Sequence, residues 1–171
     1  MERQLKKISK NGIAEAVSKV QHYRYLNQAE EAESICRDIL AVDPEHQVAM
    51  RLLGLCITDQ FTGQLTDRYK EAESCFEQLT SSYERLYYLG ILYERRAKAQ
   101  LRTGQLAQSL QASFEQAMDC FEKAEKIRPQ GNDDAVLRWN RCLRLLQGLP
   151  DLAGERETVG LEETDSPPVW K

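Results

Sequence analysis

The sequence predicts an all-α fold in which antiparallel helix hairpins stack side by side as an α-solenoid. Apolar residues recur at three- and four-residue steps through most of the chain, which is the period of an α-helix. One ridge of small, large and small residues also recurs three times in degenerate form, most completely at Ala117, Phe121, Ala124 and Pro129. Such a ridge packs against a second helix. Three copies of it indicate a repeat protein.

The first expected hairpin follows a short leader. Residues 1–12 are polar and basic and end in an Asn-Gly turn signal, so we expect an N-terminal extension there. A helix is expected from Ile13 to about Leu26, with a break at Asn27. Its partner should run from about Gln28 to Val42, which completes an antiparallel pair.

The second hairpin is expected to begin at Asp43-Pro44, because aspartate is a good N-cap and proline fits the first position of a helix. This helix contains Gly54, and a glycine inside a helix costs about 1 kcal/mol relative to alanine. We therefore expect a second helix to approach closely at Gly54. Residues 60–67 should form a loop, and the partner helix should cover residues 68–81.

The third hairpin is expected to be longer than the others. One helix should cover residues 83–103 and end at Gly104 as the residue after its cap, and its partner should cover residues 106–128. A seventh helix, expected over residues 135–147, has no partner and should cap the stack. Together these elements predict one helical repeat domain over residues 13–149, with two long helices that project beyond the shorter pairs.

Residues 150–171 differ from the rest in composition. Glycine, proline and threonine are frequent and helical periodicity is absent, so we expect an acidic, disordered tail. Two bases, Arg156 and Lys171, stand against six acids, so the tail accounts for the whole net charge of −4. The six acids are Asp151, Glu155, Glu157, Glu162, Glu163 and Asp165.

Composition also indicates the cellular compartment of the protein and the classes of partner that it does not bind. A net charge of −4 gives no field that would attract nucleic acid, and no apolar run reaches the roughly 18 residues of a membrane span. The first residues are charged and lead into no apolar stretch, so we expect no signal peptide there. The chain has five cysteines without any CxxC pair, which predicts buried thiols in a reducing compartment and no zinc site. We expect a cytoplasmic protein that binds neither nucleic acid nor membrane.

The ridge residues, taken with the residues that precede them, resemble the tetratricopeptide repeat (TPR) family, a 34-residue helix-turn-helix. The third unit matches best, the second lacks the closing proline and the first is weakest. Two insertions depart from the family pattern, since Gly54 to Ala72 is 18 residues and Gly90 to Ala117 is 27. The matching residues of the third unit are Leu86, Leu89, Gly90, Tyr93, Ala117, Phe121, Ala124 and Pro129.

The resemblance implies a right-handed superhelical stack whose first helices line a concave groove that binds a peptide or a partner helix. Stacked hairpins leave one side of every first helix facing a shared hollow, which gives the same expectation on physical grounds. Exposed arginines and glutamates are more often simply solvated, so the prediction rests on their clustering. The groove candidates are Val17, Gln21, Arg24, Tyr25, Arg51, Leu55, Thr58, Tyr87, Ile91, Glu94 and Arg95, with Arg138 and Arg141 closing the end.

One subclass of the family holds the carboxylate tails of chaperones in a clamp of lysines, asparagines and an arginine. At the corresponding positions this chain has one acid and four uncharged residues, which cannot replace such a clamp. We therefore exclude chaperone-tail binding. The five positions are Val17, Gln21, Leu52, Glu84 and Tyr88.

No catalytic motif is present, and His22 and His46 are the only histidines. We expect a non-catalytic interaction module or adaptor for a protein or peptide partner, without metal or cofactor. The alternative is a structural protein that forms homo-oligomers through the long third hairpin, or one regulated by its own acidic tail. Arg138, Arg141 and Arg144 form a basic stripe that the acids of the tail could meet.

Overall fold

A computed structural model describes residues 3–62, 67–104 and 107–149 of the chain. Within these residues the regular structure is entirely helical, which confirms the all-α prediction. The elements are η1 (Lys10–Gly12), α1 (Ile13–Tyr25), α2 (Ala29–Leu40), α3 (Gln47–Asp59), α4 (Asp67–Glu77), α5 (Ser82–Arg102), α6 (Ala107–Lys126) and α7 (Asp134–Gln147). The predicted acidic tail, residues 150–171, lies outside the described residues.

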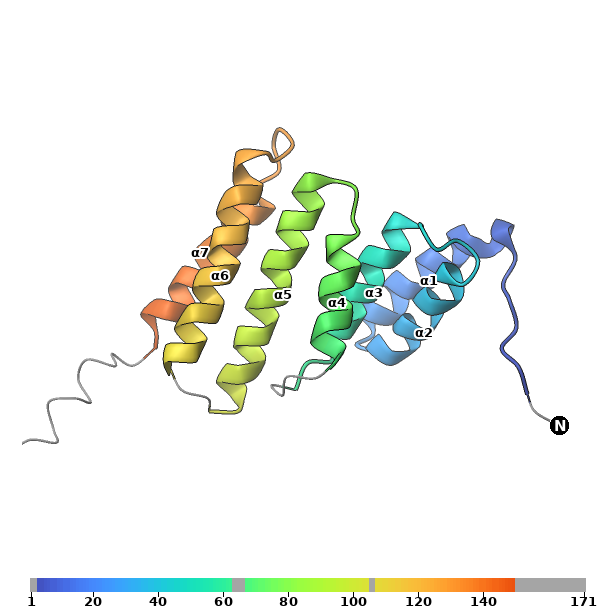
Figure 1. Cartoon of the computed structure of the whole chain (residues 1–171), viewed down its shortest axis with the longest axis horizontal. Helices are drawn as coiled ribbons and strands as arrows, with labels where there is room; N and C mark the ends of the chain where they lie inside the picture. The colour runs from blue at the N-terminus through green and yellow to red at the C-terminus, as the bar shows by residue number, and fades with distance from the viewer. Residues whose placement is uncertain (1–2, 63–66, 105–106, 150–171) are drawn as a thin grey trace, which may run out of the picture.

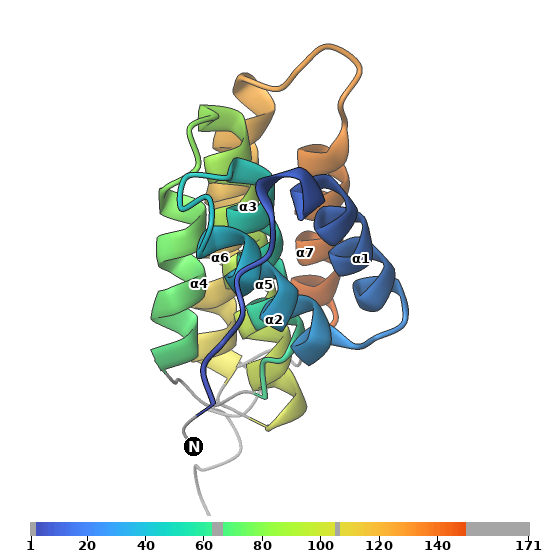
Figure 2. The same ribbon diagram turned by 90° about the vertical axis from the view of Figure 1, so that its right-hand side faces the viewer.

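The helices stand side by side in chain order (Figure 1). Each helix packs against the next one, and α1 also contacts α3, as α3 contacts α5. Successive helices run in opposite directions, so α1, α3, α5 and α7 all end at the same edge of the stack (Figure 1). Seen along the stack, α4 lies on one flank while α1 and α7 lie on the other (Figure 2). α1 and α7 thus lie on the same side of the molecule (Figure 2).

Glycine allows a close helix contact in the second and third hairpins. A Cβ atom added to Gly54 would lie 2.5 Å from Cε1 of Phe76, and one added to Gly90 would lie 2.6 Å from Cε1 of Phe121. Both phenylalanines are fully buried. Each ring therefore occupies the space that a side chain would need, which confirms the close approach expected at Gly54.

In the first hairpin, the positions that match Gly54 and Phe76 hold side chains of different sizes. Val20 takes the place of the glycine and Cys36 the place of the phenylalanine, and both are fully buried. A larger residue on the first helix is thus combined with a smaller one on the second. Because packed cores tolerate changes that conserve total volume, the hairpin can keep a filled interior without the glycine.

The start of α3 differs from the sequence prediction. The pattern at Asp43-Pro44 predicts that this helix begins there, but α3 begins at Gln47 and its N-cap is His46. The Nδ1 atom of His46 accepts a hydrogen bond of 3.1 Å from the backbone N–H of Ala49. Asp43 instead closes α2, because its N–H donates to the carbonyl of Ile39 at 2.8 Å. Asp43 thus lies in the turn that ends α2, three residues before the N-cap of α3.

The cysteines lie in the packed interior, apart from the partly exposed Cys120. Burial raises the pKa of the Cys75 thiol to about 11 and that of Cys142 to about 12. All five cysteines are free. Buried thiols with raised pKa values react slowly, as expected for packing residues. In the described part of the chain, no helix has the length and apolar character to cross a membrane.

Candidate functional site

Two pockets open on the side formed by the odd-numbered helices. The first, here called the tyrosine pocket, lies between α1, α3 and α5 and has a volume of about 300 Å³. The second, the basic pocket, has a volume of about 280 Å³. The tyrosine pocket is lined by Gln21, Arg24, Tyr25, Arg51, Leu52, Leu55 and Tyr88. The basic pocket is lined by Thr58, Asp59, Phe61, Arg95, Lys98, Ala99, Arg102 and Arg138.

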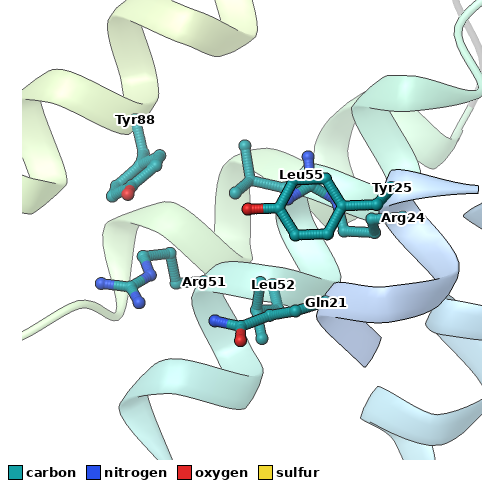
Figure 3. A pocket seen from close by; sticks show the side chains of 7 residues that line it. All are labelled: Gln21, Arg24, Tyr25, Arg51, Leu52, Leu55 and Tyr88. Atoms are coloured by element: carbon teal, nitrogen blue, oxygen red, sulfur yellow. The ribbon is translucent and has the colours of Figure 1, made fainter. Parts of the chain in front are cut away.

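The tyrosine pocket has two aromatic walls and an apolar floor. Tyr25 of α1 and Tyr88 of α5 lie on opposite sides, with Leu52 and Leu55 of α3 between them (Figure 3). Tyr25 is 90% exposed, so almost none of its ring is covered by the chain itself. A large aromatic side chain left open above buried leucines can contact a second molecule with little rearrangement.

The pocket's two arginines are held in place by the chain's own acids. The Nη1 atom of Arg51 donates to Glu84 at 2.6 Å, and its guanidinium carbon lies 5.7 Å from the centre of the Tyr88 ring. The Nε atom of Arg24 donates to Asp59 at 2.9 Å. A guanidinium has five N–H donors, so each arginine keeps donors for another acceptor.

Ion pairs connect the two pockets across α1, α3 and α5. Asp59 accepts from Arg24 and also pairs with Arg95 at 2.5 Å. Arg95 donates further to the carbonyl of Leu55 at 3.1 Å and to the hydroxyl of Thr58 at 2.5 Å. Burial lowers the pKa of the Arg95 guanidinium, while the charge of Asp59 opposes that shift. Arg95 therefore fixes the end of α3 against α5.

A buried carboxylate joins α5 to α7. Glu94 is fully buried, and it accepts from Lys98 one turn later and from Nη1 of Arg138 at 3.3 Å. Its two partners are partly exposed, with 29% and 36% of their side chains accessible. An unpaired carboxylate in the interior would cost several kcal/mol, so the ion pairs with these two cations offset the burial of Glu94.

The predicted groove residues fall into two groups. Seven of them, from Gln21 to Arg95 along the chain, line one of the two pockets, as does Arg138. Tyr87, Ile91 and Glu94 line neither pocket, because Tyr87 stacks on Tyr83 and Ile91 and Glu94 are buried. Arg138 of α7 reaches across to pair with Glu94 of α5. Val17 is half-buried and Arg141 exposed, and neither lines a pocket.

Some lining residues were not among the predicted groove residues. Leu52 and Tyr88 are each one position from a predicted residue, a step of about 100° around a helix. Lys98 and Arg102 follow Arg95 at three- and seven-residue steps on one face of α5. That spacing of three cations was a signal in the sequence. Phe61 lies just after α3, where no helical spacing predicts its position.

A second polar cluster lies between α2, α3 and α4. Glu33 accepts from Arg68 at 2.5 Å, from Arg37 at 2.7 Å and from Gln60 at 2.7 Å. The bonds from Arg68 lower the pKa of Glu33 most, to about 2, and those from Arg37 and Gln60 add to the effect, while burial opposes it. Because its acceptor positions are filled by the chain, Glu33 holds helices together and is a poor candidate for catalysis.

Comparison with protein-family models gives no match for this chain, and comparison with curated proteins gives no relative. Within the described residues, no group of three or more His, Cys, Asp or Glu side chains is placed to hold a metal ion. His46 serves as the N-cap of α3 and His22 is exposed on α1. A functional role therefore has to be inferred from the geometry of the two pockets.

Proposed function

We propose that this chain is a non-catalytic interaction module of the TPR type, which binds a peptide or helix of a partner protein. In this proposal the hairpins form a right-handed superhelical stack with α1, α3 and α5 on its inner side. The contacts of α1 with α3 and of α3 with α5 support that curvature. The repeated glycine–phenylalanine contact at Gly54 and Gly90 supports a common repeat unit.

The observation that carries the proposal is the tyrosine pocket itself. Three first helices build it, and it combines an uncovered tyrosine, a second tyrosine and a floor of leucines. Tyrosine and arginine are enriched where proteins bind each other, because they combine large contact area with polar groups. A volume of about 300 Å³ suits one or two side chains of a peptide better than a larger ligand.

The residues around the pocket indicate the chemistry of its occupant. An apolar side chain fits between Tyr25 and Tyr88 above Leu55, and the free donors of Arg24 and Arg51 suit backbone carbonyls or an acid beside it. Gln21 offers both a donor and an acceptor to a peptide backbone. The proposed ligand is thus a segment with one apolar anchor flanked by acceptor groups, in a reducing compartment such as the cytoplasm.

A random peptide library tests this proposal, because it samples many candidate segments at once. Peptides selected on the intact chain should bind at least tenfold more weakly when Tyr25→Ala is introduced, measured by titration calorimetry. Arg51→Ala should weaken them as well and change folding stability little, because Arg51 is partly exposed. Tyr25 is 90% exposed, so its truncation leaves the core intact.

The matched control is Leu137→Ala, which removes an apolar side chain that is 64% exposed on α7, away from the tyrosine pocket. It should leave peptide affinity unchanged. Selection of no peptide, or of peptides whose affinity is the same in the Tyr25→Ala and Leu137→Ala variants, would contradict the proposed function.

A further inference from the structure

We infer that the basic pocket is a docking site for an acidic segment of the same chain, residues 151–165. The site is distinct from the tyrosine pocket and the inference does not depend on the proposed partner. It rests on the charge of the pocket, on the place where α7 ends and on the composition of the residues that follow. The carboxylates of this segment are Asp151, Glu155, Glu157, Glu162, Glu163 and Asp165, with Arg156 as its one base.

The basic pocket has more positive than negative groups. Its lining includes the cations Arg95, Lys98, Arg102 and Arg138 and one acid, Asp59. The carboxylate of Glu94 lies buried beneath two of the cations and must also be counted. Four cations against two acids leave two positive charges in excess. The carbonyl ends of α3 and α5 each add about half a negative charge, which reduces the excess without cancelling it.

Arg102 is the pocket cation that no residue in the described part of the chain engages. It is exposed near the end of α5, and it forms no ion pair or side-chain hydrogen bond with any other residue in the described part of the chain. Lys98 and Arg138 are 29% and 36% exposed beside it, so their outer donors also face solvent. The pocket therefore presents several donors to a carboxylate without breaking an existing ion pair.

The acidic segment starts at the same edge of the molecule. α5 and α7 run in the same direction, so Gln147 at the end of α7 lies at the edge where Arg102 ends α5 (Figure 1). Arg138 lies nine residues before Gln147, roughly 14 Å back along the helix at 1.5 Å per residue. Eight residues from Leu149 to Glu157 reach at most about 26–29 Å. The first carboxylates of the segment can therefore reach the pocket.

Connectivity explains why the chain's own segment is the expected occupant. Individual exposed ion pairs are weak and are screened by salt, so a short acidic peptide from solution would bind the pocket poorly. A segment attached a few residues away has an effective concentration of the order of millimolar. Weak pairs are then sufficient to keep the pocket occupied. Phe61 and Ala99 in its lining offer apolar contact to the apolar residues among the acids, such as Leu161.

Nuclear magnetic resonance of the full ¹⁵N-labelled chain tests the inference directly. If the segment docks, Arg102→Glu should shift the backbone amide signals of residues 151–165. The same signals should shift in about 0.5 M salt, where screening is strong. Lys123→Glu is the matched control, since Lys123 is an exposed cation on α6 outside both pockets. Segment signals that do not respond to Arg102→Glu, or respond equally to Lys123→Glu, would overturn the docking site.

A competition experiment identifies the occupant. A synthetic peptide of residues 151–165 should bind about tenfold more tightly to a full chain in which Glu155, Glu157, Glu162 and Glu163 are replaced by glutamine. The reason is that the attached segment would no longer compete. Equal affinity for both chains would show that the attached segment is not the occupant, and the inference would fail while the peptide test of the tyrosine pocket remained unaffected.

Discussion

Gly90 and Phe121 set the spacing of the third hairpin. Phe121 is fully buried, and a Cβ atom at Gly90 would come within 2.6 Å of its ring. Glycine is thus needed at position 90 because the Phe121 ring fills the space that a side chain would occupy. Gly54 and Phe76 repeat the arrangement, which makes this pair the clearest link between the sequence pattern and the fold.

Gly90→Ala should therefore destabilise the protein, although alanine is the better helix former. Overpacking costs about 1–3 kcal/mol and the gain in helix propensity is about 1 kcal/mol, so we expect a net loss of up to about 2 kcal/mol. Urea denaturation measures this change in the free energy of unfolding.

The control combines the substitution with a smaller partner. In a Phe121→Leu background the ring is gone, so Gly90→Ala should be neutral or stabilising relative to that background. A double-mutant cycle then gives the coupling between the two positions. If Gly90→Ala stabilised the natural sequence by the full helix-propensity gain, the close contact would not constrain the hairpin.

At the scale of the helices, the sequence predicted which segments pair but not every residue at their ends and faces. The ridges at Phe76 and Phe121 and the glycines opposite them could be identified from spacing, since helix packing depends on local periodicity. Tyr88 lines the tyrosine pocket while Tyr87 packs inside, and one position along a helix decides between these environments. Tyr87 packs against Phe121 of α6, and local periodicity does not determine that contact between helices.

Contacts between helices that are distant in the sequence could likewise not be predicted from local spacing. The four-residue step from Glu33 to Arg37 predicts a pair on one helix. Arg68 joins them from α4, and Gln60 from just after α3, only in the folded chain. The same is true of Glu94, whose partner Arg138 lies 44 residues away. The partners of buried charged residues are therefore among the contacts that sequence spacing alone could not predict.

The cluster around Glu33 predicts a pH dependence of the contact between α2 and α4. Its pKa is lowered from 4.5 to about 2, chiefly by the hydrogen bonds from Arg68. A lowered pKa gives stability that is present above pH 4.5 and is lost as the pH falls through about 2. We expect Glu33→Gln to lose roughly 2–3 kcal/mol near pH 7, and the difference from the natural sequence to disappear toward pH 2.

Denaturant unfolding between about pH 2 and pH 7 measures this effect. Glu15→Gln is the control, because Glu15 pairs with Lys19 on an exposed face of α1, with 74% of its side chain accessible. That variant should follow the natural sequence at every pH. A stability difference for Glu33→Gln that stayed constant with pH would show that the carboxylate charge contributes nothing to the contact.

Across the whole molecule, the helices differ in how much of the interior they form. α1 contributes one buried residue, Val20, whereas nine residues of α3 are buried. α5 and α6 are the longest helices, with 21 and 20 residues, and pack along each other. Because each hairpin of such a stack contacts only its neighbours, local stability follows these differences.

Hydrogen exchange followed by mass spectrometry should show this gradient. Backbone amides of α1 should exchange fastest among the helices and those in the middle of α3 and α5 slowest, because opening α1 exposes the least apolar surface. The measurement needs no variant, and peptides from α2 and α4 give internal references. Equal protection of α1 and α3 would mean that the stack unfolds as one cooperative unit.

The placement of the helices along one line also has a mechanical consequence. α1 and α7 lie at opposite ends of the long axis (Figure 1). Tension applied between them would load the hairpins in series, so each would detach at its own force and lengthen the molecule by one step.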